Sequence, residues 1–311
     1  MTPAWRKATM LRRIKEAARI LLKGTGSSDG IRKAFFDGHF YSPVVDTGEL
    51  DRDKARVWPE SAELPGIDFN EAEQRRWLTE ILPRHLPDYD YPDERPFDAD
   101  ESVFHTRNSQ FSWLDSRTLF AVLRELRPRK MIEIGSGFSS LLTADVNRRF
   151  LGGGLELICI EPFPRPFLRK GVTGITRLIE SRVQDVPLAT FAGLEAGDVL
   201  FIDSSHVSKT GSDVNFIYFE VLPRLQPGVV VHIHDIFLPG DYPKHWVIDL
   251  GIQWNEQYLV RAMLMDSHGF EVLFGCAYVL DRFPDLVKQV LGGELYGGGS
   301  LWLRRMGRNP A

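Results

Sequence analysis

The stretch KMIEIGSGFSS, residues 130–140, decides the fold class of this chain. It begins with a short apolar run typical of a buried strand, turns at Gly135, Ser136 and Gly137, and continues into a run that predicts a helix through Arg149. A glycine turn between a strand and a helix brings the free N–H groups of the helix N-terminus close to any ligand that lies there. One Gly-x-Gly is weak evidence by itself, so the rest of the chain has to supply the context.

Short apolar runs alternate with helical segments on both sides of this turn. Besides residues 130–134, strands are predicted at residues 155–160, 175–179, 198–202, 228–234, 270–277 and 300–304. Further helices are predicted at residues 115–126, 213–225 and 254–267, the first two with Asp115 and Asp213 as their caps. Continuous apolar strands are buried on both faces, as in parallel sheets. The alternation therefore predicts a doubly wound, Rossmann-like α/β domain over residues 106–311, with right-handed crossovers.

Residues 1–105 have a different composition and are predicted to form an accessory extension. Residues 4–23 are basic and carry apolar side chains at helical spacing, which predicts a basic amphipathic helix. This helix makes a weak contact with an anionic membrane or a partner, covers the protein's own acidic segment, or is a frayed terminus. In that segment, residues 37–104, prolines interrupt every long element except a helix predicted at residues 70–82 with Asn70 as its N-cap.

Composition and charge exclude several classes of protein. The chain has 311 residues and a net charge of -4 at pH 7, so we expect no nucleic acid among its partners. No uncharged apolar run reaches about 18 residues, so we predict no membrane span. Cys159 and Cys276 lie in apolar, strand-like runs and are predicted to be buried free thiols. We expect a soluble, cytoplasmic protein.

Glu161, about 26 residues after the glycine turn, closes the next predicted strand. A carboxylate in this position can accept hydrogen bonds from two ribose hydroxyls. A dinucleotide site would add a third glycine for the pyrophosphate, but this chain has Ser140 there, and Glu133 at the strand end suits a cationic ligand better. S-adenosylmethionine, with a sulfonium, an ammonium and a ribose but no phosphate, fits these residues. An NAD(P)-dependent Rossmann oxidoreductase is the alternative.

Four blocks of the sequence resemble the class I S-adenosylmethionine-dependent methyltransferases: IEIGSGFSS, CIEPFP, GDVLFIDSSHVSKTGSDVNFIYFEVLPRL and PGVVVHIHDIFLP. They are most similar to a bacterial subgroup whose members are largely uncharacterised, and the resemblance covers about residues 108–277. It implies a seven-stranded, mostly parallel sheet of order 3-2-1-4-5-7-6, in which the seventh strand is antiparallel.

The resemblance also implies how the cofactor would be held. Glu133 and the turn at residues 135–137 would line its methionine end, and Glu161 would hold its ribose. Gln184 and Asp185, which follow the third predicted strand, would lie near its adenine.

Acids and histidines follow the fourth and fifth predicted strands. Asp203 and His206 come after the fourth strand, and His234 and Asp235 come after the fifth. Ligands of open α/β sheets bind beyond the carboxyl ends of the strands, and the resemblance makes these two strands neighbours, so we expect the four side chains to converge. His232 lies deeper in its strand and is expected to be structural.

Three interpretations of these four residues stay open. In the first, Asp203 and Asp235, with His206 or His234, bind Mg²⁺ or another divalent cation that lowers the pKa of a substrate hydroxyl. This resembles the metal-dependent O-methyltransferases, which carry Asp-Asn or Glu-Asp where this chain has His234-Asp235. In the second, His234 or His206 is a general base oriented by an aspartate. In the third, the groups only satisfy one another.

The sequence therefore predicts a methyltransferase that acts on an oxygen of a small-molecule or glycan-like acceptor, with His234, Asp203 and His206 as the catalytic residues. A non-catalytic binding module on the same fold is a further alternative, because a fold does not fix an activity.

Overall fold

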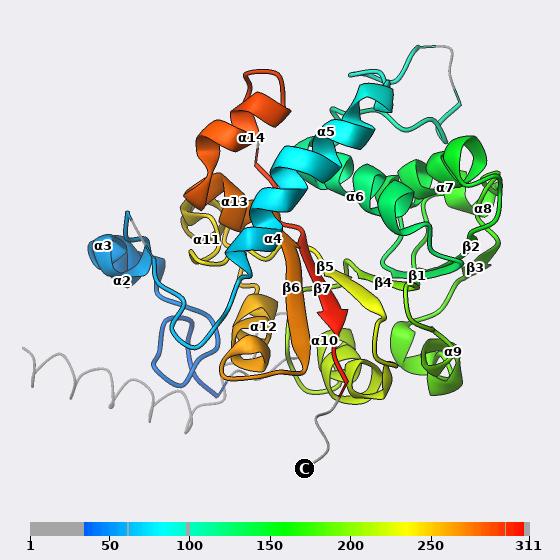
Figure 1. Ribbon diagram of the computed structural model, residues 1–311. Coiled ribbons are helices and arrows are strands. Elements are labelled where there is room, and N and C mark those ends of the chain that lie inside the picture. The colour runs from blue at the N-terminus through cyan, green and yellow to red at the C-terminus, as the bar shows by residue number, and fades with distance from the viewer. Residues whose placement is uncertain (1–33, 61, 98–99, 296, 308–311) are drawn as a thin grey trace, which may run out of the picture. The chain divides into compact units, whose positions relative to one another are not determined.

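The computed structural model describes residues 34–60, 62–97, 100–295 and 297–307 (Figure 1). Its contacts divide the chain into two compact units. One unit comprises the described residues up to Glu60 together with Pro243–Gln253, and the other comprises the remaining described residues. The basic helix predicted at residues 4–23 lies outside the described residues.

The larger unit is built on a seven-stranded sheet of order β3-β2-β1-β4-β5-β7-β6. Its strands are β1 (Lys130–Ile134), β2 (Glu156–Ile160), β3 (Arg177–Ile179), β4 (Val199–Ile202), β5 (Val230–Ile233), β6 (Phe270–Gly275) and β7 (Leu301–Arg305). The first five strands pair in parallel, whereas β7 is antiparallel to both of its neighbours. The sheet order and the antiparallel seventh strand predicted from the sequence are confirmed.

Helices cover both faces of this sheet (Figure 1). On one face lie α4 (Glu71–Arg76), α5 (Leu82–His85), α6 (Trp113–Leu126), α7 (Phe138–Phe150), α8 (Pro166–Arg169), α13 (Cys276–Arg282) and α14 (Pro284–Val290). On the other face lie α9 (Leu188–Ala192), α10 (Asp213–Phe216) and α12 (Glu256–Leu264). The strands alternate between the two cores: Met131 of β1 packs into the first and Ile132 into the second. Burial on both faces explains why the strands read as continuous apolar runs.

The predicted helix at residues 70–82 is present with Asn70 as its N-cap residue, but the side chain does not form the capping hydrogen bond. The helix runs through α4, a wider turn at Trp77–Ile81 and α5. Asn70 stands at the cap position, yet its side chain makes no capping hydrogen bond and its Nδ2 instead donates to Glu271 Oε1 at 3.3 Å. Trp77 and Ile81 belong to the same core as α6, so this part of the predicted extension packs into the sheet unit.

Three further local predictions are corrected. Ser112 rather than Asp115 is the N-cap residue of α6, and Ser212 rather than Asp213 caps α10 by accepting a hydrogen bond from the Asn215 N–H. The strand predicted to reach residue 277 ends at Gly275, and the next residue opens α13. Both cysteines are buried and free, as predicted.

The smaller unit holds short helices in its described part: α2 (Thr47–Arg52), α3 (Lys54–Val57) and α11 (Lys244–Ile248). An ion pair of 2.8 Å between Lys244 Nζ and Asp51 Oδ1 joins α11 to α2. Beside these helices the ring of His39 stacks against Phe35 and Phe40, at centroid distances of 4.7 Å and 4.3 Å. An aromatic cluster therefore forms the other part of this unit.

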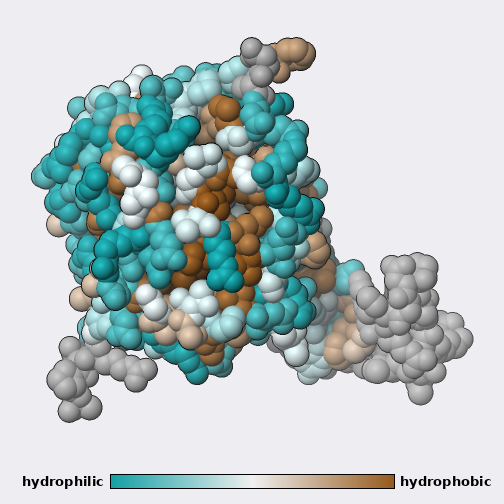
Figure 2. Space-filling model, turned by 90° about the vertical axis from the view of Figure 1, so that its right-hand side faces the viewer, coloured by the Kyte–Doolittle hydropathy of each residue, from teal (hydrophilic) through white to brown (hydrophobic). Residues whose placement is uncertain are grey.

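The surface of the protein is mixed in character. On the face drawn in Figure 2, hydrophilic residues cover most of the area and hydrophobic ones gather in its middle. Within the part of the chain that the structure describes, no helix is both long enough and apolar enough to cross a bilayer.

Gly135, the first residue after β1, sits at the closest approach of two loops. Its φ is +80°, and a Cβ built on it would lie 1.7 Å from the carbonyl oxygen of Asp203, which follows β4. Its N–H also donates to Ile160 O of β2 at 3.0 Å. Only glycine satisfies both the left-handed backbone and the contact, so this residue fixes how the loops after β1 and β4 meet.

We predict that Gly135→Ala lowers the free energy of unfolding by more than about 3 kcal/mol, because strain and overlap add. Gly152→Ala is the matched control: its φ is +66° but no atom lies within 4 Å of the added Cβ, so we expect a loss of only about 1 kcal/mol. Urea denaturation measures both losses. Equal losses for the two variants would show that overlap with the Asp203 carbonyl oxygen adds no destabilisation.

Candidate active site

The glycine turn and Glu161 meet at the carboxyl edge of the sheet. Glu161 Oε2 accepts a hydrogen bond from the Ser136 N–H at 3.2 Å, and its Oε1 accepts one from the Phe163 N–H at 2.8 Å. The Gly137 N–H donates to Ser140 Oγ at 3.0 Å, so the serine that replaces a third glycine holds the first turn of α7. The carboxylate that the sequence assigns to a ribose therefore lies directly against the glycine turn.

Glu133 is completely buried beneath this turn. Its Oε1 accepts a hydrogen bond from Ser139 Oγ at 2.5 Å, and its Oε2 lies 3.6 Å from Cys159 Sγ on the neighbouring strand. Burial raises the pKa of Glu133 to about 7. Its place at the methionine end of a cofactor stays a prediction.

The two residues assigned to the adenine lie on a short turn after β3, Val183–Asp185. Gln184 Nε2 donates to the carbonyl oxygen of Gly211 at 3.2 Å. Asp185 is exposed and pairs with Arg182 at 2.9 Å. Because β3 is the neighbour of β2, this turn lies at the same edge of the sheet as Glu161.

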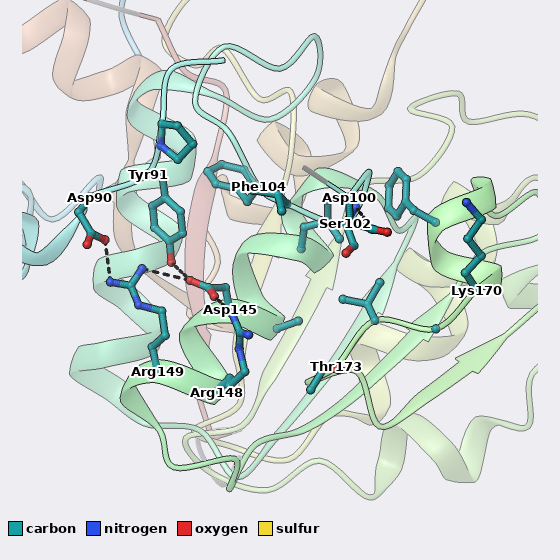
Figure 3. Close-up of a pocket in the computed structure, with 17 residues that line it drawn as sticks. Asp90, Tyr91, Asp100, Ser102, Phe104, Asp145, Arg148, Arg149, Lys170 and Thr173 are labelled. Carbon is teal, nitrogen blue, oxygen red and sulfur yellow. Dashed lines mark hydrogen bonds and ion pairs between the residues drawn. The ribbon is translucent and has the colours of Figure 1, made fainter. Parts of the chain in front are cut away.

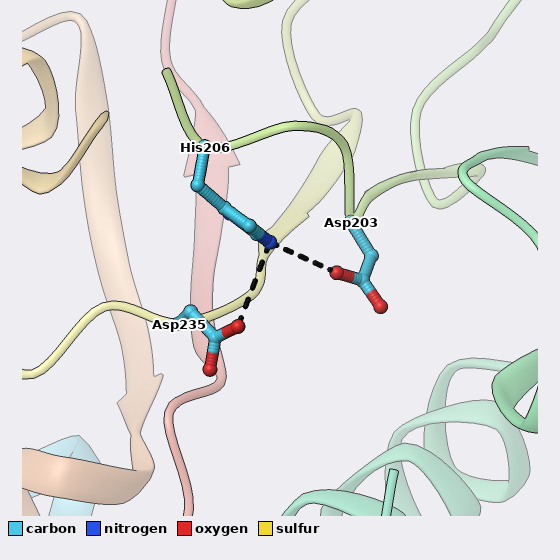
Figure 4. A group of neighbouring side chains, drawn as sticks. All are labelled: Asp203, His206 and Asp235. Carbon is cyan, nitrogen blue, oxygen red and sulfur yellow. Dashed lines mark ion pairs between the residues drawn. The ribbon is translucent and has the colours of Figure 1, made fainter. Parts of the chain in front are cut away.

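The acids and histidines after β4 and β5 converge, as the sequence led us to expect. Figure 4 shows three of them, Asp203, His206 and Asp235. His206 Nε2 lies 3.3 Å from Asp203 Oδ1 and 3.5 Å from Asp235 Oδ2. His234 Nδ1 lies 3.3 Å from the same oxygen of Asp235 and 3.7 Å from that of Asp203. Asp203, His206 and Asp235 can each offer one ligand atom, and these atoms lie within 4.8 Å of one another.

The backbone is held in an unusual conformation at two of these residues. His206 has a φ of +58° and Asp235 a φ of +56°, both in the left-handed region that residues with a Cβ avoid. Such positions cost of order 1–3 kcal/mol and persist where the surroundings enforce them, most often at functional sites. Here they bring the imidazole of His206 to both Asp203 and Asp235.

Two further carboxylates, which the sequence analysis missed, stand behind the histidines. Glu256, the first residue of α12, is completely buried, and its Oε2 lies 2.9 Å from His206 Nδ1. Asp115 Oδ2 lies 3.6 Å from His234 Nε2. Asp115 also accepts hydrogen bonds from the backbone N–H groups of Gly299 and Ser300, at 3.2 Å and 2.8 Å. Both acids occupy the first turn of a helix, where the helix dipole ordinarily stabilises an acidic side chain, so their positions carried no functional signal.

The carboxylates favour the charged form of both histidines. Burial opposes the charge on His206, but the carboxylates of Asp203 and Glu256 outweigh it and raise its pKa to about 10. Burial likewise opposes the charge on His234, yet Asp235, Asp203 and Asp115 raise its pKa well above the ordinary value. Conversely, although burial disfavours its charge, the two histidines lower the pKa of Asp203 to about 2.

Negative charge exceeds positive charge in this cluster. The cluster holds four carboxylates, those of Asp115, Asp203, Asp235 and Glu256. In the described part of the chain, all the ion pairs that they form are with His206 and His234. Four carboxylates and two imidazolium rings leave a formal excess of negative charge among buried and half-buried groups. In addition, both ring nitrogens of His234 and Oε1 of Glu256 are buried without a hydrogen-bond partner. Buried polar groups normally have partners, so the cluster suits a bound cation.

His232 stays apart from this chemistry. Its Nε2 lies 2.9 Å from Ser300 Oγ, and its ring stacks on Phe201 with centroids 3.7 Å apart. Burial and the nearby charge of His234 hold its pKa well below the ordinary value, so it is neutral. This agrees with the structural role expected from the sequence.

A separate pocket of about 530 Å³ lies between α7, the end of α8 and residues 90–92 and 100–104 (Figure 3). Asp145 lines this pocket. It accepts a hydrogen bond from Tyr91 Oη at 2.8 Å and forms ion pairs with Arg148 and Arg149. Arg149 also pairs with Asp90 at 2.7 Å. These charges neutralise one another, and none of the cluster residues lines this pocket.

Known proteins resemble this chain in sequence and in fold. The family described as a methyltransferase domain matches residues 132–236, which span β1, the glycine turn and the loops after β4 and β5. An uncharacterised protein of Archaeoglobus fulgidus is 38% identical over 191 residues, which are 60% of this chain and 85% of that protein. The chain belongs to the class I S-adenosylmethionine-dependent methyltransferases.

Solved structures of other methyltransferases are more distant. An O-methyltransferase from Bacillus cereus in complex with S-adenosylhomocysteine is 14% identical, with a TM-score of 0.37 over 77% of this chain and 98% of that one. The 16S rRNA (adenine(1408)-N(1))-methyltransferase from Catenulisporales acidiphilia is 14% identical, with a TM-score of 0.28 over 64% and 96%. The usual cofactor of this family is S-adenosylmethionine, and these distant likenesses do not bear on the acceptor of this methyltransferase.

Glu133 makes the stability of this methyltransferase depend on pH. Its pKa is about 7 when folded and 4.5 in the reference state, so the unfolded chain loses the proton first as the pH rises. The folded state therefore loses up to about 3 kcal/mol between pH 4.5 and pH 7, and nothing further above that range.

We predict that Glu133→Gln removes this loss, so that the variant gains stability over the wild type as the pH rises from 4.5 to 8. Denaturant unfolding at a series of pH values measures the difference. Glu63→Gln, at an exposed acid, is the control and should follow the wild type. If the free energies of unfolding of Glu133→Gln and the wild type changed equally with pH, the raised pKa of Glu133 would be contradicted.

Proposed function

We propose that this methyltransferase transfers the methyl group of S-adenosylmethionine to a hydroxyl oxygen of a small-molecule or glycan-like acceptor. The observation that carries the proposal is the convergence of Asp203, His206, His234 and Asp235 beyond the carboxyl ends of β4 and β5. The close contact between Gly135 and Asp203 sets this cluster beside the glycine turn. A group that receives a methyl at oxygen has to lose a proton, and such a cluster can assist that loss.

The residues around the glycine turn fit the cofactor. Glu161 would accept hydrogen bonds from the ribose hydroxyls. Each of its carboxylate oxygens receives one backbone N–H and can accept a further donor. The turn at residues 135–137 would approach the methionine end, with Glu133 beneath it, and Gln184 and Asp185 would lie near the adenine. S-adenosylmethionine, when bound, supplies an electrophilic methyl on sulfur. The chain's own part is to hold the acceptor oxygen in line with that methyl.

The cluster fits a divalent cation at Asp203 and Asp235, with His206 as the third ligand. Three ligand atoms lie close together, the surrounding charge is negative, and neighbouring polar atoms have no hydrogen-bond partner. A divalent cation would supply Lewis acidity, lowering the pKa of an acceptor hydroxyl. His234, backed by Asp115, lies beside Asp235 and would take the released proton.

A histidine acting alone as the general base is the second candidate. His234 has the position for it, but the carboxylates around it hold its pKa well above the ordinary value and keep the ring protonated. A protonated imidazole cannot accept a proton, so the base role needs a cation that neutralises the aspartates. This favours the metal-assisted form of the proposal.

The cofactor is tested by calorimetric titration of the purified chain with S-adenosylhomocysteine and, separately, with NADH. Micromolar binding of S-adenosylhomocysteine without binding of NADH is the expected result. Binding of NADH alone would favour the oxidoreductase alternative, and binding of neither would favour a non-catalytic module.

We predict that Glu161→Ala weakens the binding of S-adenosylhomocysteine by more than about tenfold, because two charge-assisted hydrogen bonds to the ribose are lost. Glu180→Ala is the matched control, since Glu180 is an acid that follows the neighbouring strand β3 and pairs with Arg169. Its affinity should equal that of the wild type. Unchanged affinity in Glu161→Ala would remove the ribose assignment.

We predict that Asp203→Asn and His234→Gln each reduce turnover by more than about 100-fold while the affinity for S-adenosylhomocysteine changes little. The measurement is the release of S-adenosylhomocysteine with a panel of phenols, catechols and sugars as acceptors. Normal turnover in both variants would show that the cluster is not catalytic.

A further inference from the structure

The histidine of the candidate metal site, His206, has a hydrogen-bond partner on its second ring nitrogen, as metal-binding histidines normally do. His206 Nδ1 lies 2.9 Å from the carboxylate of Glu256, which is completely buried. In the neutral ring that a metal ion would bind, Nδ1 would keep its proton and donate it to Glu256, and the lone pair of Nε2 would face the two aspartates. Metal-binding histidines almost always have such a partner on the second ring nitrogen, because it fixes the tautomer and the ring orientation.

The orientation of this ring is fixed from three more directions. Its centroid lies 4.4 Å from that of Trp254, which packs beside it. The carbonyl oxygen of His206 accepts hydrogen bonds from the backbone N–H groups of Asn255 and Glu256, at 3.0 Å and 3.1 Å. The left-handed backbone at His206 completes the arrangement. The start of α12 therefore holds the imidazole rigidly against Asp203 and Asp235.

The donor set then limits the kind of ion. Mg²⁺ takes oxygen ligands and keeps several waters, so an oriented imidazole gives it no advantage. Imidazole nitrogen together with carboxylate oxygen suits first-row transition metals, and affinity at such sites rises from Mn²⁺ through Fe²⁺ and Co²⁺. His234 is 5% exposed, and its ring nitrogens meet Asp235 at 3.3 Å and Asp115 at 3.6 Å without the geometry of a hydrogen bond. This is a second sign that a ligand belongs beside Asp235.

We infer that Asp203, His206 and Asp235 bind a first-row transition-metal ion such as Mn²⁺, Fe²⁺, Co²⁺ or Zn²⁺ in preference to Mg²⁺, and that Glu256 is the positioning residue that fixes His206 for it. The inference rests on the proposed function for the use of the metal in methyl transfer, but the binding site is defined by the geometry alone. No ion pair with lysine or arginine competes for these carboxylates in the described part of the chain.

The test is metal binding by the full, untagged chain after removal of metal with a chelator. Co²⁺ is titrated in and followed by its visible d–d absorption, and Mn²⁺ and Mg²⁺ are titrated by calorimetry. We expect one site per chain at which Co²⁺ and Mn²⁺ bind more than about tenfold more tightly than Mg²⁺. Equal affinity for Mn²⁺ and Mg²⁺, or no saturable Co²⁺ site, would overturn the inference.

Three variants separate the ligand from its positioning residue. His206→Gln should remove the Co²⁺ spectrum, and Glu256→Gln should weaken Co²⁺ binding by about 10–100-fold and shift the spectrum, with a smaller effect on Mg²⁺. His268→Gln, at an exposed histidine, is the matched control and should bind Co²⁺ like the wild type. A wild-type spectrum in His206→Gln would overturn the ligand assignment. Should Glu256→Gln fail to fold, the comparison of metals on the wild type still decides the question.

The outcome is separable from that of the proposed function. Selective Co²⁺ binding by a chain that methylates no hydroxyl would support this inference and contradict the proposed function. Methylation by a chain that binds Mn²⁺ and Mg²⁺ equally, or that has no saturable Co²⁺ site, would support the proposed function and contradict this inference.

Discussion

The contact between Gly135 and the carbonyl oxygen of Asp203 is the constraint on which the candidate site depends. A side chain at residue 135 would occupy the space of that oxygen, so the loops after β1 and β4 can meet only around a glycine. The same loop after β1 receives Glu161 through the Ser136 N–H, and the loop after β4 carries Asp203 and leads to His206. One backbone contact thus places the residues assigned to the cofactor beside the cluster assigned to the acceptor.

The cluster itself is costly, which is an argument for its function. Carboxylates and histidines that are removed from water lose hydration, and ion pairs among them repay this cost only in part. Two residues, His206 and Asp235, also hold strained backbone conformations. A structure that served packing alone would gain stability from apolar side chains at these positions. Glu133 follows the same pattern on the cofactor side, since burial makes its charged form unfavourable near neutral pH.

The sequence predicted the features that depend on strand order and strand ends. The strand at residues 130–134 was predicted with its observed bounds, and the cluster followed because the carboxyl ends of adjacent parallel strands meet at one edge. Asp115 and Glu256 could not be found in this way, because each reaches the site from the first turn of a helix far away in the chain. Asn70 stands at the predicted cap position, but its capping hydrogen bond is absent for a similar reason: the side chain forms a tertiary hydrogen bond to β6 instead.

The two histidines differ in a way that separates their roles. His206 Nδ1 lies at a hydrogen-bonding distance of 2.9 Å from Glu256. His234 Nε2 faces Asp115 at 3.6 Å, and its Nδ1 meets Asp235 at 3.3 Å without the geometry of a hydrogen bond. A ligand needs one fixed orientation, and a proton acceptor needs a free nitrogen and a charge that can change. A cation on the two aspartates would withdraw the negative charge that keeps His234 protonated. His206, whose orientation is fixed, therefore suits metal binding, and His234 suits proton transfer.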